Sequence, residues 1–554
     1  MNLEERIKAG MLFYESGHVD PVNQEIEERL KNERKDCKEL MFDYNHCRPG
    51  DQDRQLKILK ELLGSCVRRA VLTGLARFTW QGTLPEHIYD ILYSVVTEDS
   101  PRVRCCVHKE RAVLKNRINM ALGLTVGLNI VEASKIALTE PVNKALPIID
   151  VLPEACDQCP IDKFLVTDAC RHCVAHKCMN KCPKKAITIH QNRAYIDKTK
   201  CIECGMCKKV CPYGAIIEIS RPCERSCALN AIHAGADRKA KIDTSKCVEC
   251  GSCRSACPFG AIDERSNIVQ IIQAIRAGQR VHALLAPSFI GQMGFKVTPP
   301  QIVAALKKMG FAAIEEVAVG ADMTALHETK EFMEKVPARQ KYMTNSCCPA
   351  FVALIQKHLP NEADKVSTTV SPMVACGRYV KSEYPEAVTV FIGPCIAKKG
   401  EARKFSDAID YVLTFEELAC MMAGAEIDPA TLASESYINQ ASGFGISFPL
   451  LKGVQGALNH TLEELEETQV QAHYASGLEA CLDDMKKLAS GKLPCQYFEG
   501  MACVNGCIDG PGALAESGLV SVLIKKYASE SQHKTVHGDT TAVKAVKKVD
   551  MEVR

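Results

Sequence analysis

The hydrophobic pattern divides the chain into parts with different periodicities. Over residues 54–78 apolar positions recur at helical spacing, so the first 140 or so residues are predicted to be mostly helical. Between about 280 and 520 the pattern changes: buried runs at 281–289 and 386–394 are typical of strands that end in loops, and segment 301–311 is typical of an amphipathic helix. This alternation indicates α/β units with ligand loops at the strand ends.

Composition and charge narrow the class of protein. Hydrophobic residues make up 46% and charged residues 25% of the chain, a globular composition. The formal net charge is +2 and no lysine or arginine run is typical of a nucleic-acid patch, so we expect no nucleic-acid partner. Neither an apolar signal core nor a run of the roughly 20 apolar residues needed to span a bilayer is found, so we expect a cytoplasmic protein without a membrane partner. The polar sequence after about 526 predicts a tail that is mobile at least in part.

The number and clustering of the cysteines indicate a more specific class of protein than composition and charge do. The chain contains 30 cysteines, 16 of them between residues 150 and 262. Secreted disulfide scaffolds are usually short, whereas this chain has 554 residues, so the cysteines are interpreted as thiols in a reducing cytoplasm. Clustered thiols in that setting indicate metal binding.

Two runs in this block are nearly the same. Residues 196–216 read IDKTKCIECGMCKKVCPYGAI and residues 242–262 read IDTSKCVECGSCRSACPFGAI. Each contains Cys-x2-Cys-x2-Cys-x3-Cys-Pro, the bacterial ferredoxin spacing, in which three thiolates of one loop bind one [4Fe–4S] cluster and the fourth binds its neighbour. A zinc site would need four ligands in two well-separated pairs, so the spacing predicts iron–sulfur clusters.

The first run has a partner motif directly upstream, within residues 170–183. The pair predicts one cluster on Cys170, Cys173, Cys178 and Cys211 and a second on Cys201, Cys204, Cys207 and Cys182. Two histidines, His172 and His176, lie among these ligands. Imidazole can replace thiolate at iron. Each predicted cluster already has four cysteine ligands, however, so we expect these two to be surface or hydrogen-bonding histidines.

The second run lacks an adjacent partner. The fourth cysteine of each motif is followed by x-x-x-Ala-Ile, and the same ending recurs at 227–232, which indicates a motif split by an insertion. A whole two-cluster ferredoxin (about 163–218) is then inserted into the first binding loop of another. The outer clusters are predicted to bind through Cys156, Cys159, Cys223 and Cys257, and through Cys247, Cys250, Cys253 and Cys227.

Three later segments place cysteines in loop-like contexts: TNSCCPAF (344–351), FIGPCIAKKGEA (391–402) and FEGMACVNGCIDGPG (498–512). Each is ambiguous by itself, although Cys503 and Cys507 lie one helical turn apart and the surrounding glycines permit close approach of a bulky ligand. Together the three segments resemble the signature motifs of the [FeFe]-hydrogenase catalytic domain, over about residues 280–520.

That resemblance implies an H-cluster, in which a [4Fe–4S] cubane joins a two-iron subsite with CO, cyanide and a bridging dithiolate. The implied cubane ligands are Cys348, Cys395, Cys503 and Cys507, of which Cys507 also bridges to the two-iron subsite. Lys398 matches the lysine expected to bond a cyanide, a charge-assisted contact. The other implied neighbours of the subsite are Pro287, Ser288 and Met501.

The resemblance also implies a proton relay. Cys347 matches the relay thiol, and Glu328, Glu331 and Ser367 match the groups that lead to the surface. Glu328 and Glu331 are three residues apart and therefore share a helix face, as general acid–base transfer along that face requires. Without the resemblance, a solvated acidic face would be the better interpretation.

The sequence departs from the best-known members of that family at several positions. Ala350-Phe351 stands where Gly-Trp is usual, Gly393 replaces a methionine, Met373 replaces a glutamine, and the last motif has fewer glycines. Changes around a metal group tune its potential and proton handling, so catalytic bias, rate and oxygen tolerance stay open.

The resulting fold class is multidomain α+β. We expect a helical N-terminal domain of unknown role (1–145), nested 2[4Fe–4S] ferredoxin-like modules (146–265), a two-lobed α/β hydrogenase catalytic domain (275–525) and a polar C-terminal tail (526–554). The implied activity is reversible reduction of protons to H₂, with four accessory clusters, a ferredoxin or similar small carrier, and maturation proteins for the two-iron subsite. The alternatives are a hydrogen-sensing regulatory protein and an iron–sulfur assembly or electron-transfer protein without the two-iron subsite.

Overall fold

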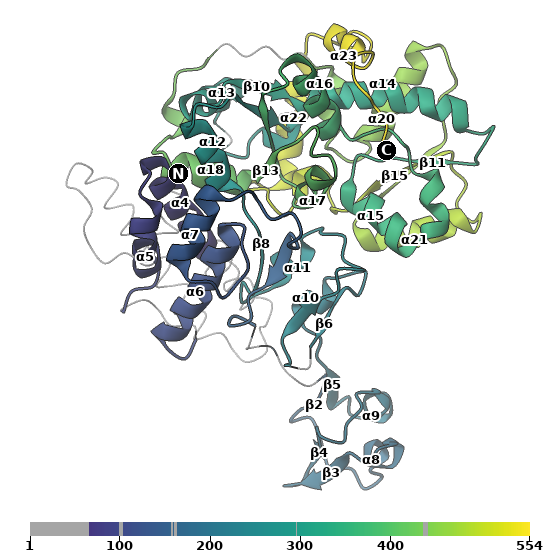
Figure 1. Cartoon of the computed structure of the whole chain (residues 1–554). Coiled ribbons are helices and arrows are strands. Elements are labelled where there is room, and N and C mark those ends of the chain that lie inside the picture. The colour runs from purple at the N-terminus through teal and green to yellow at the C-terminus, as the bar shows by residue number, and fades with distance from the viewer. Residues whose placement is uncertain are drawn as a thin grey trace.

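The computed structural model describes residues 66–98, 104–156, 159, 163–235, 237–294, 296–435 and 441–553. The first half of the helix predicted over 54–78 lies outside these residues. The rest begins a group of four helices: α4 (Cys66–Gln81), α5 (Leu84–Val95), α6 (Val107–Ala121) and α7 (Ile130–Thr139). α4 contacts α12 (Ile268–Arg276) and α18 (Phe415–Gly424), so the group packs on the later part of the chain (Figure 1). None of the described helices is long and apolar enough to cross a bilayer.

One lobe of the later part is built on a four-stranded parallel sheet. Its strand order is β10 (Ala313–Glu316), β9 (Val281–Leu285), β12 (Val388–Gly393) and β13 (Tyr411–Thr414). The central strand β9 is buried along its whole length, as expected for a continuous apolar strand covered on both faces. The predicted helix within 301–311 is α13 (Pro299–Lys308), and α16 (Pro372–Glu383) contacts β9 and β12.

The other lobe has a three-stranded parallel sheet. Its order is β11 (Met343–Thr344), β15 (Tyr497–Met501) and β14 (Ala472–Ser476). Its helices are α14 (Val317–Lys335), α15 (Pro349–His358), α20 (Gly453–Glu464) and α21 (Leu478–Ala489). Loops after β9 and β12 of the first sheet, and after β11 and β15 of this one, contain the three cysteine segments and Pro287-Ser288, so both lobes contribute to one site.

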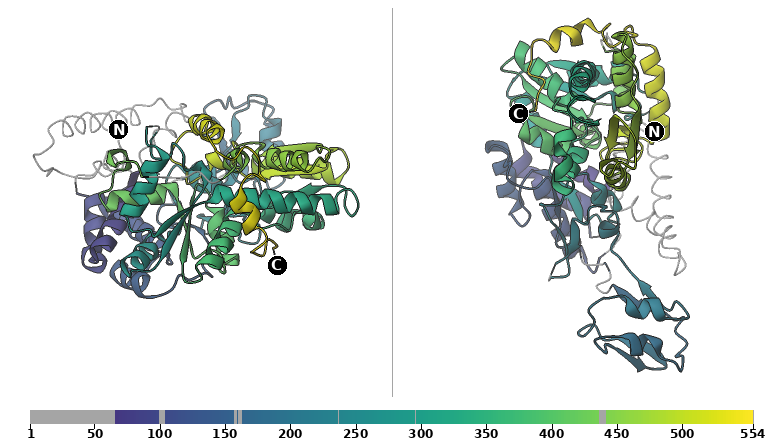
Figure 2. Two further views of the ribbon diagram at one scale, coloured as in Figure 1. Left: turned by 90° about the horizontal axis from the view of Figure 1, so that it is seen from above. Right: turned by 90° about the vertical axis from the view of Figure 1, so that its right-hand side faces the viewer.

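Two small modules of the same kind lie between α7 and α12. The outer module contains β1 (Ile149–Val151), α10 (Pro222–Arg225), β6 (Ile232–Ala234), β7 (Ala240–Ile242), α11 (Ser252–Ala256) and β8 (Ile262–Glu264). The inner module contains β2 (Phe164–Val166), α8 (Lys177–Lys181), β3 (Ile187–His190), β4 (Arg193–Ile196), α9 (Met206–Val210) and β5 (Ile216–Glu218). β2 to β5 fall inside the sequence between the paired strands β1 and β8, and the inner module stands apart at the far end of the outer one (Figures 1 and 2).

A buried ionic network joins these parts. Arg68 of α4 donates to Asp263 at 2.7 Å and to Glu264 at 2.5 Å, both in β8, and to Glu416 of α18 at 2.5 Å. Arg254 of α11 contacts Glu264 at 2.8 Å and also Glu416. Burial alone would lower the pKa of Arg68, but the surrounding carboxylates hold it well above its usual value. Fully paired buried charges of this kind fix the relative position of the elements that supply them.

The end of the chain differs from the mobile tail expected from its polar sequence. Helix α22 (Ser517–Ser529) is followed by α23 (Thr540–Ala545), and Val536, Ala542 and Met551 are buried. Asp539 caps α23 by accepting from two of its backbone N–H groups. The tail is held because these few apolar side chains reach the core, and they are too widely spaced to show as a periodic pattern.

Candidate active site at the junction of the two lobes

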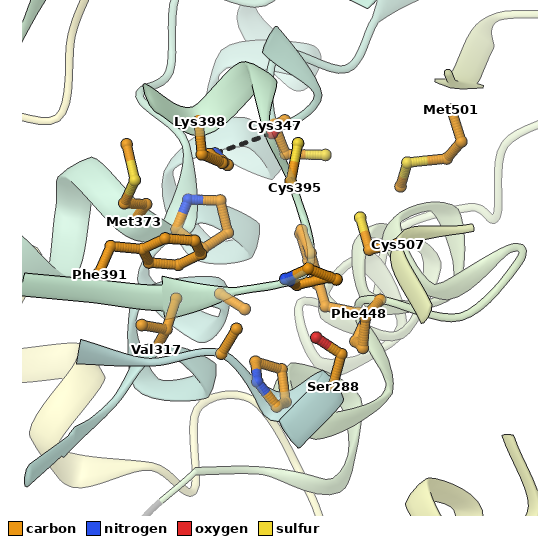
Figure 3. A pocket seen from close by; sticks show the side chains of 16 residues that line it. Ser288, Val317, Cys347, Met373, Phe391, Cys395, Lys398, Phe448, Met501 and Cys507 are labelled. Carbon is orange, nitrogen blue, oxygen red and sulfur yellow. Dashed lines mark hydrogen bonds between the residues drawn. The ribbon is translucent and has the colours of Figure 1, made fainter. Parts of the chain in front are cut away.

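A cavity lies where the loops of the two lobes meet (Figure 3). Ser288 comes from the loop after β9, Cys395 and Lys398 from the segment after β12, and Cys507 from the loop after β15. Most of the other lining residues are apolar. A largely apolar cavity with a few polar and thiol groups directed into it is the usual form of a cofactor site.

Of the four predicted cubane ligands, Cys395 and Cys507 line this cavity, and Cys348 and Cys503 lie near enough to influence their ionisation, although no three side chains of the described residues are already arranged to hold a metal ion. Cys348 begins α15, Cys395 follows β12, and Cys503 and Cys507 follow β15. Burial, together with the neighbouring thiols of the group, raises the pKa of Cys395 to about 12 and that of Cys503 well above its usual value. Ionising these clustered thiols therefore requires a cation such as iron, which is the usual coupling of metal binding to proton release.

Gly506 shapes the loop that presents Cys507. Its φ is +79°, and a Cβ there would lie 2.7 Å from the carbonyl oxygen of Pro449. The loop approaches so closely that the backbone N–H of Cys507 donates to the same oxygen at 2.9 Å. Glycine is needed at this position because other residues rarely adopt that backbone conformation.

Two polar groups at the cavity fit an anionic metal-bound ligand. The Ser288 hydroxyl is buried and has no hydrogen-bond partner among the described residues, although it lines the cavity. Lys398 donates to the Cys347 carbonyl at 3.2 Å, to Ser371 at 2.9 Å and to Glu401 at 2.6 Å. Burial opposes its charge, but Glu401 outweighs burial and raises the pKa of Lys398, so the ammonium is retained. The donor set thus fits the H-cluster implied by the sequence.

The candidate relay groups lie together and are buried. Glu328 is only 1% exposed and Glu331 6%, so the solvated acidic face considered from the sequence is wrong. Ser367 donates to Glu331 at 2.6 Å and also lies within hydrogen-bonding reach of Glu328. Lys335, closer to the surface, donates to Glu331 at 2.6 Å. The groups form a continuous line from the interior toward solvent.

Their protonation states differ. Burial, with the nearby Glu331 carboxylate, raises the pKa of Glu328 to about 8. Burial also opposes ionisation of Glu331, but Lys335, Ser367 and Thr368 outweigh it and lower that pKa to about 2. Near pH 7 Glu328 is therefore a neutral acid able to donate a proton, and Glu331 is a carboxylate able to accept one.

Cys347 stands between the cavity and this line. Its thiol accepts a hydrogen bond from the Asn345 amide at 3.1 Å, and Asn345 is fixed in turn by the Gly500 backbone N–H at 2.8 Å. Burial and then the Glu328 charge raise the pKa of Cys347 well above its usual value, so the protonated thiol is favoured.

The departures from the family pattern affect the packing of this site. Phe391 folds back so that its ring would lie 2.7 Å from a Cβ at Gly393, and it lines the cavity together with Met373. The ring therefore fills space beside the position where a methionine was expected. Phe351 packs against Gly500 and stacks on Phe498 at a centroid distance of 5.9 Å.

Several neighbours of the site were not predicted from the sequence. Tyr497 donates to Glu328 at 3.2 Å, and the buried Glu499 accepts from the backbone N–H groups of Lys452 and Gln455. Both lie on β15. Tyr497 directly precedes the cysteine segment 498–512 and Glu499 lies within it, which is a signal that could have identified them. Glu401 lies three residues after Lys398 on α17 (Ala397–Lys404), a spacing that indicates a side-chain pair.

The cysteines of the two small modules also gather in groups. Cys223 is buried and Cys159 is half-buried. Burial and then the neighbouring thiols raise the pKa of both, and this group comprises Cys156, Cys159, Cys223 and Cys257. A second group surrounds Cys253 and comprises Cys227, Cys247, Cys250 and Cys253. In the inner module a hollow is lined by Cys170, Cys173, Cys178 and Cys211. Cys207 lies near Cys201 and Cys204, and Cys182 packs beside the same small core.

The repeated Ala-Ile ending has a structural reason. The backbone N–H of the alanine donates to the sulfur of the preceding fourth cysteine in three copies, Ala186 to Cys182, Ala231 to Cys227 and Ala261 to Cys257, each at 3.3 Å. Such bonds favour the thiolate that a cluster needs.

The two histidines of the first binding loop occupy special backbone positions. His172 and His176 both have left-handed φ values, +47° and +39°, and line the same hollow as the cysteines of that loop. Their ring centroids are 5.4 Å apart.

Comparison with known families agrees with this geometry. Residues 279–511 match the iron-only hydrogenase large subunit, C-terminal domain, and residues 194–217 and 240–263 each match a 4Fe–4S binding domain. These matches define an [FeFe]-hydrogenase-like iron–sulfur protein. Residues 6–66 match a maltose acetyltransferase hexapeptide capping motif, almost wholly outside the described residues.

Individual relatives fall into two kinds. The chain is 29% identical over 371 residues to iron hydrogenase 1 of Clostridium pasteurianum, covering 57% of this chain and 64% of that protein. It is 29% identical over 381 residues to the periplasmic [Fe] hydrogenase large subunit of Nitratidesulfovibrio vulgaris, covering 59% and 88%. It is also 26% identical over 301 residues to cytosolic iron-sulfur assembly component 3 of Bos taurus, covering 44% and 63%. The chain thus spans less than two thirds of the first of these proteins.

Among solved structures, an [FeFe]-hydrogenase from Chlamydomonas reinhardtii aligns with a TM-score of 0.42 and 18% identity. The alignment covers 51% of this chain and 94% of that one.

Proposed function

We propose that the chain is an [FeFe]-hydrogenase that catalyses 2H⁺ + 2e⁻ ⇌ H₂. The observation that supports this proposal is the buried group of Glu328, Ser367 and Glu331, which lies near the cavity thiol Cys347 and reaches Lys335 closer to the surface. A protein that only transferred electrons through the cavity would not need buried proton donors and acceptors behind it.

The residues have separate tasks in this proposal. The cubane would bind to Cys348, Cys395, Cys503 and Cys507, and Lys398 with Ser288 would contact the anionic ligands of the two-iron subsite. When bound, the H-cluster supplies the metal chemistry that joins protons and electrons. Pro287 and Met501 exclude water beside it.

Proton movement is the task of the chain itself. During hydrogen formation, the Cys347 thiol would give its proton toward the cavity and take another from Glu328. Glu328 would be reprotonated from Glu331 through the Ser367 hydroxyl, and Glu331 would receive a proton at its exposed side. Hydrogen oxidation uses the reverse order. The neutral state of Glu328 and the ionised state of Glu331 suit these donor and acceptor tasks.

Electrons would pass through four [4Fe–4S] clusters to or from a ferredoxin-like carrier. The group containing Cys250 is the one next to the catalytic site, because Cys250 lies close enough to Cys503 to raise its thiol pKa. The other groups follow outward through the outer and inner modules.

The similarity to cytosolic iron-sulfur assembly component 3 favours a second candidate, an iron–sulfur assembly protein without the two-iron subsite. Infrared spectroscopy of anaerobically matured protein distinguishes the two. We expect CO and cyanide stretching bands together with hydrogen turnover. Matured protein that contains its full complement of [4Fe–4S] clusters but lacks these bands would contradict the hydrogenase proposal.

The nested pairing of the accessory cysteines predicts a specific loss in Cys159→Ser. Cys159 belongs to the group of Cys156, Cys223 and Cys257, so we expect the variant to lose about four iron atoms while the inner module keeps both clusters. Iron analysis with electron paramagnetic resonance of the reduced protein measures both effects. Cys105→Ser is the matched control, because Cys105 is exposed and outside the groups. Unchanged iron content in Cys159→Ser would disprove the pairing.

A further inference from the structure

The far end of the inner module is strongly basic. Residues 170–193 contain six lysines and arginines and no aspartate or glutamate, although one of the six, Arg193, pairs at 2.6 Å with Asp168 just before this segment. The corresponding part of the outer module, residues 222–239, mixes three basic residues with two acidic ones. The basic segment includes α8 and reaches β4, which lie at the end of the inner module farthest from the two catalytic lobes (Figure 1).

Exposed apolar side chains lie beside the cysteine group of this end. Val174 is 95% exposed and follows Cys173 directly, and Tyr213 is 56% exposed and follows Cys211 by two residues. Phe259, which holds the place of Tyr213 in the outer module, is partly buried against that module's core. An exposed apolar patch inside a charged surround is typical of a protein interaction site.

The far end of the inner module holds the last cysteine group in the series that starts at the catalytic site. The group of Cys250 adjoins the catalytic site at Cys503, and the remaining groups lie successively farther away along the outer and inner modules (Figures 1 and 2). The hollow of Cys170, Cys173 and Cys178 is the last of the series. A cluster at the last position serves an electron path only when electrons enter or leave there.

We propose that the far end of the inner module, comprising Val174, Tyr213 and the basic residues of 170–193, is the docking surface for a small acidic electron carrier. This inference rests on the proposed function only in that the inner clusters must transfer electrons. The carrier loses one electron, the terminal [4Fe–4S]²⁺ cluster gains it, and no proton or bond changes hands. Opposite charges steer such encounters and make their rate depend on salt.

Lys177 and Lys181 offer a direct test. They begin and end α8, four residues apart and both exposed. The probe is an acidic flavodoxin in its hydroquinone form, whose oxidation to the semiquinone is followed by stopped flow against full-length protein with reconstituted accessory clusters. We expect Lys177→Glu/Lys181→Glu to lower the second-order rate constant roughly tenfold or more at low salt and to weaken its salt dependence.

The matched control is Lys200→Glu/Lys209→Glu, an equal charge change on the same module but outside residues 170–193. We expect it to change the rate constant less than about twofold, while dithionite, a small reductant, reduces the clusters of all variants alike. If both double variants lowered the rate constant equally, or if only the control variant lowered it, the inference would be overturned. Because no step requires hydrogen turnover, a protein without CO and cyanide bands could still show the expected result, so the two proposals fail separately.

Discussion

Cys347→Ala is expected to lower hydrogen turnover roughly 100- to 10,000-fold, the usual contribution of a positioned general acid or base. The Cys347 thiol faces the cavity on one side and the Glu328 carboxyl on the other, so its removal interrupts proton delivery without removing a cubane ligand. Hydrogen production driven by a chemical reductant measures the loss, and the CO and cyanide bands verify that the active-site group is present.

Cys495→Ala is the matched control for this change. Cys495 packs against the same lobe core but is partly exposed and does not line the cavity. We expect it to retain turnover within about twofold of the unmodified protein. If Cys347→Ala also retained turnover with its infrared bands intact, protons would have to reach the cavity by another route.

Glu328→Gln is expected to produce a loss of similar size for a different reason. At pH 7 the native side chain is a neutral acid, because its pKa is about 8, so the amide preserves charge and size and can still accept from Tyr497. What the amide cannot do is release a proton, and turnover should fall roughly 100-fold or more. Tyr497→Phe is the comparison variant: it removes a neighbour of Glu328 but no proton-carrying group in the line, and we expect a much smaller loss.

The same substitution has a predictable effect on stability. The pKa of Glu328 rises from 4.5 to about 8 on folding, so the folded state binds the extra proton between these values. Its stability therefore falls as pH rises from about 4.5 to about 8. The glutamine of Glu328→Gln does not titrate. The unfolding temperature of the variant, relative to that of the native protein, should therefore rise between about pH 4.5 and about pH 8. A constant difference between pH 5 and pH 9 would mean that Glu328 is already ionised in the fold.

The local motifs could be predicted from sequence because their chemistry depends on short spacings. Cys201, Cys204 and Cys207 lie in one tight loop, and no long-range information is needed to bring them together. The matches to the iron-only hydrogenase and 4Fe–4S families agree with the motifs predicted from these short spacings.

What could not be predicted depends on contacts between distant segments. Glu328 and Glu331 have the same spacing as many solvated acidic pairs, and they are buried because Tyr497 and the segment around Ser367 cover them. The C-terminal segment was expected to be mobile for a related reason, since only a contact with the core distinguishes Met551 from an exposed residue.

The nesting of one module inside the other has a consequence for synthesis on the ribosome. All eight cysteines of the inner module have emerged once Cys211 is translated, whereas the outer module needs Cys257, which lies beyond it in the sequence. Domains generally fold as units in the order in which they are made. The inner module can therefore mature first, and the strands β1 and β8 then close the outer one around an insert that is already finished.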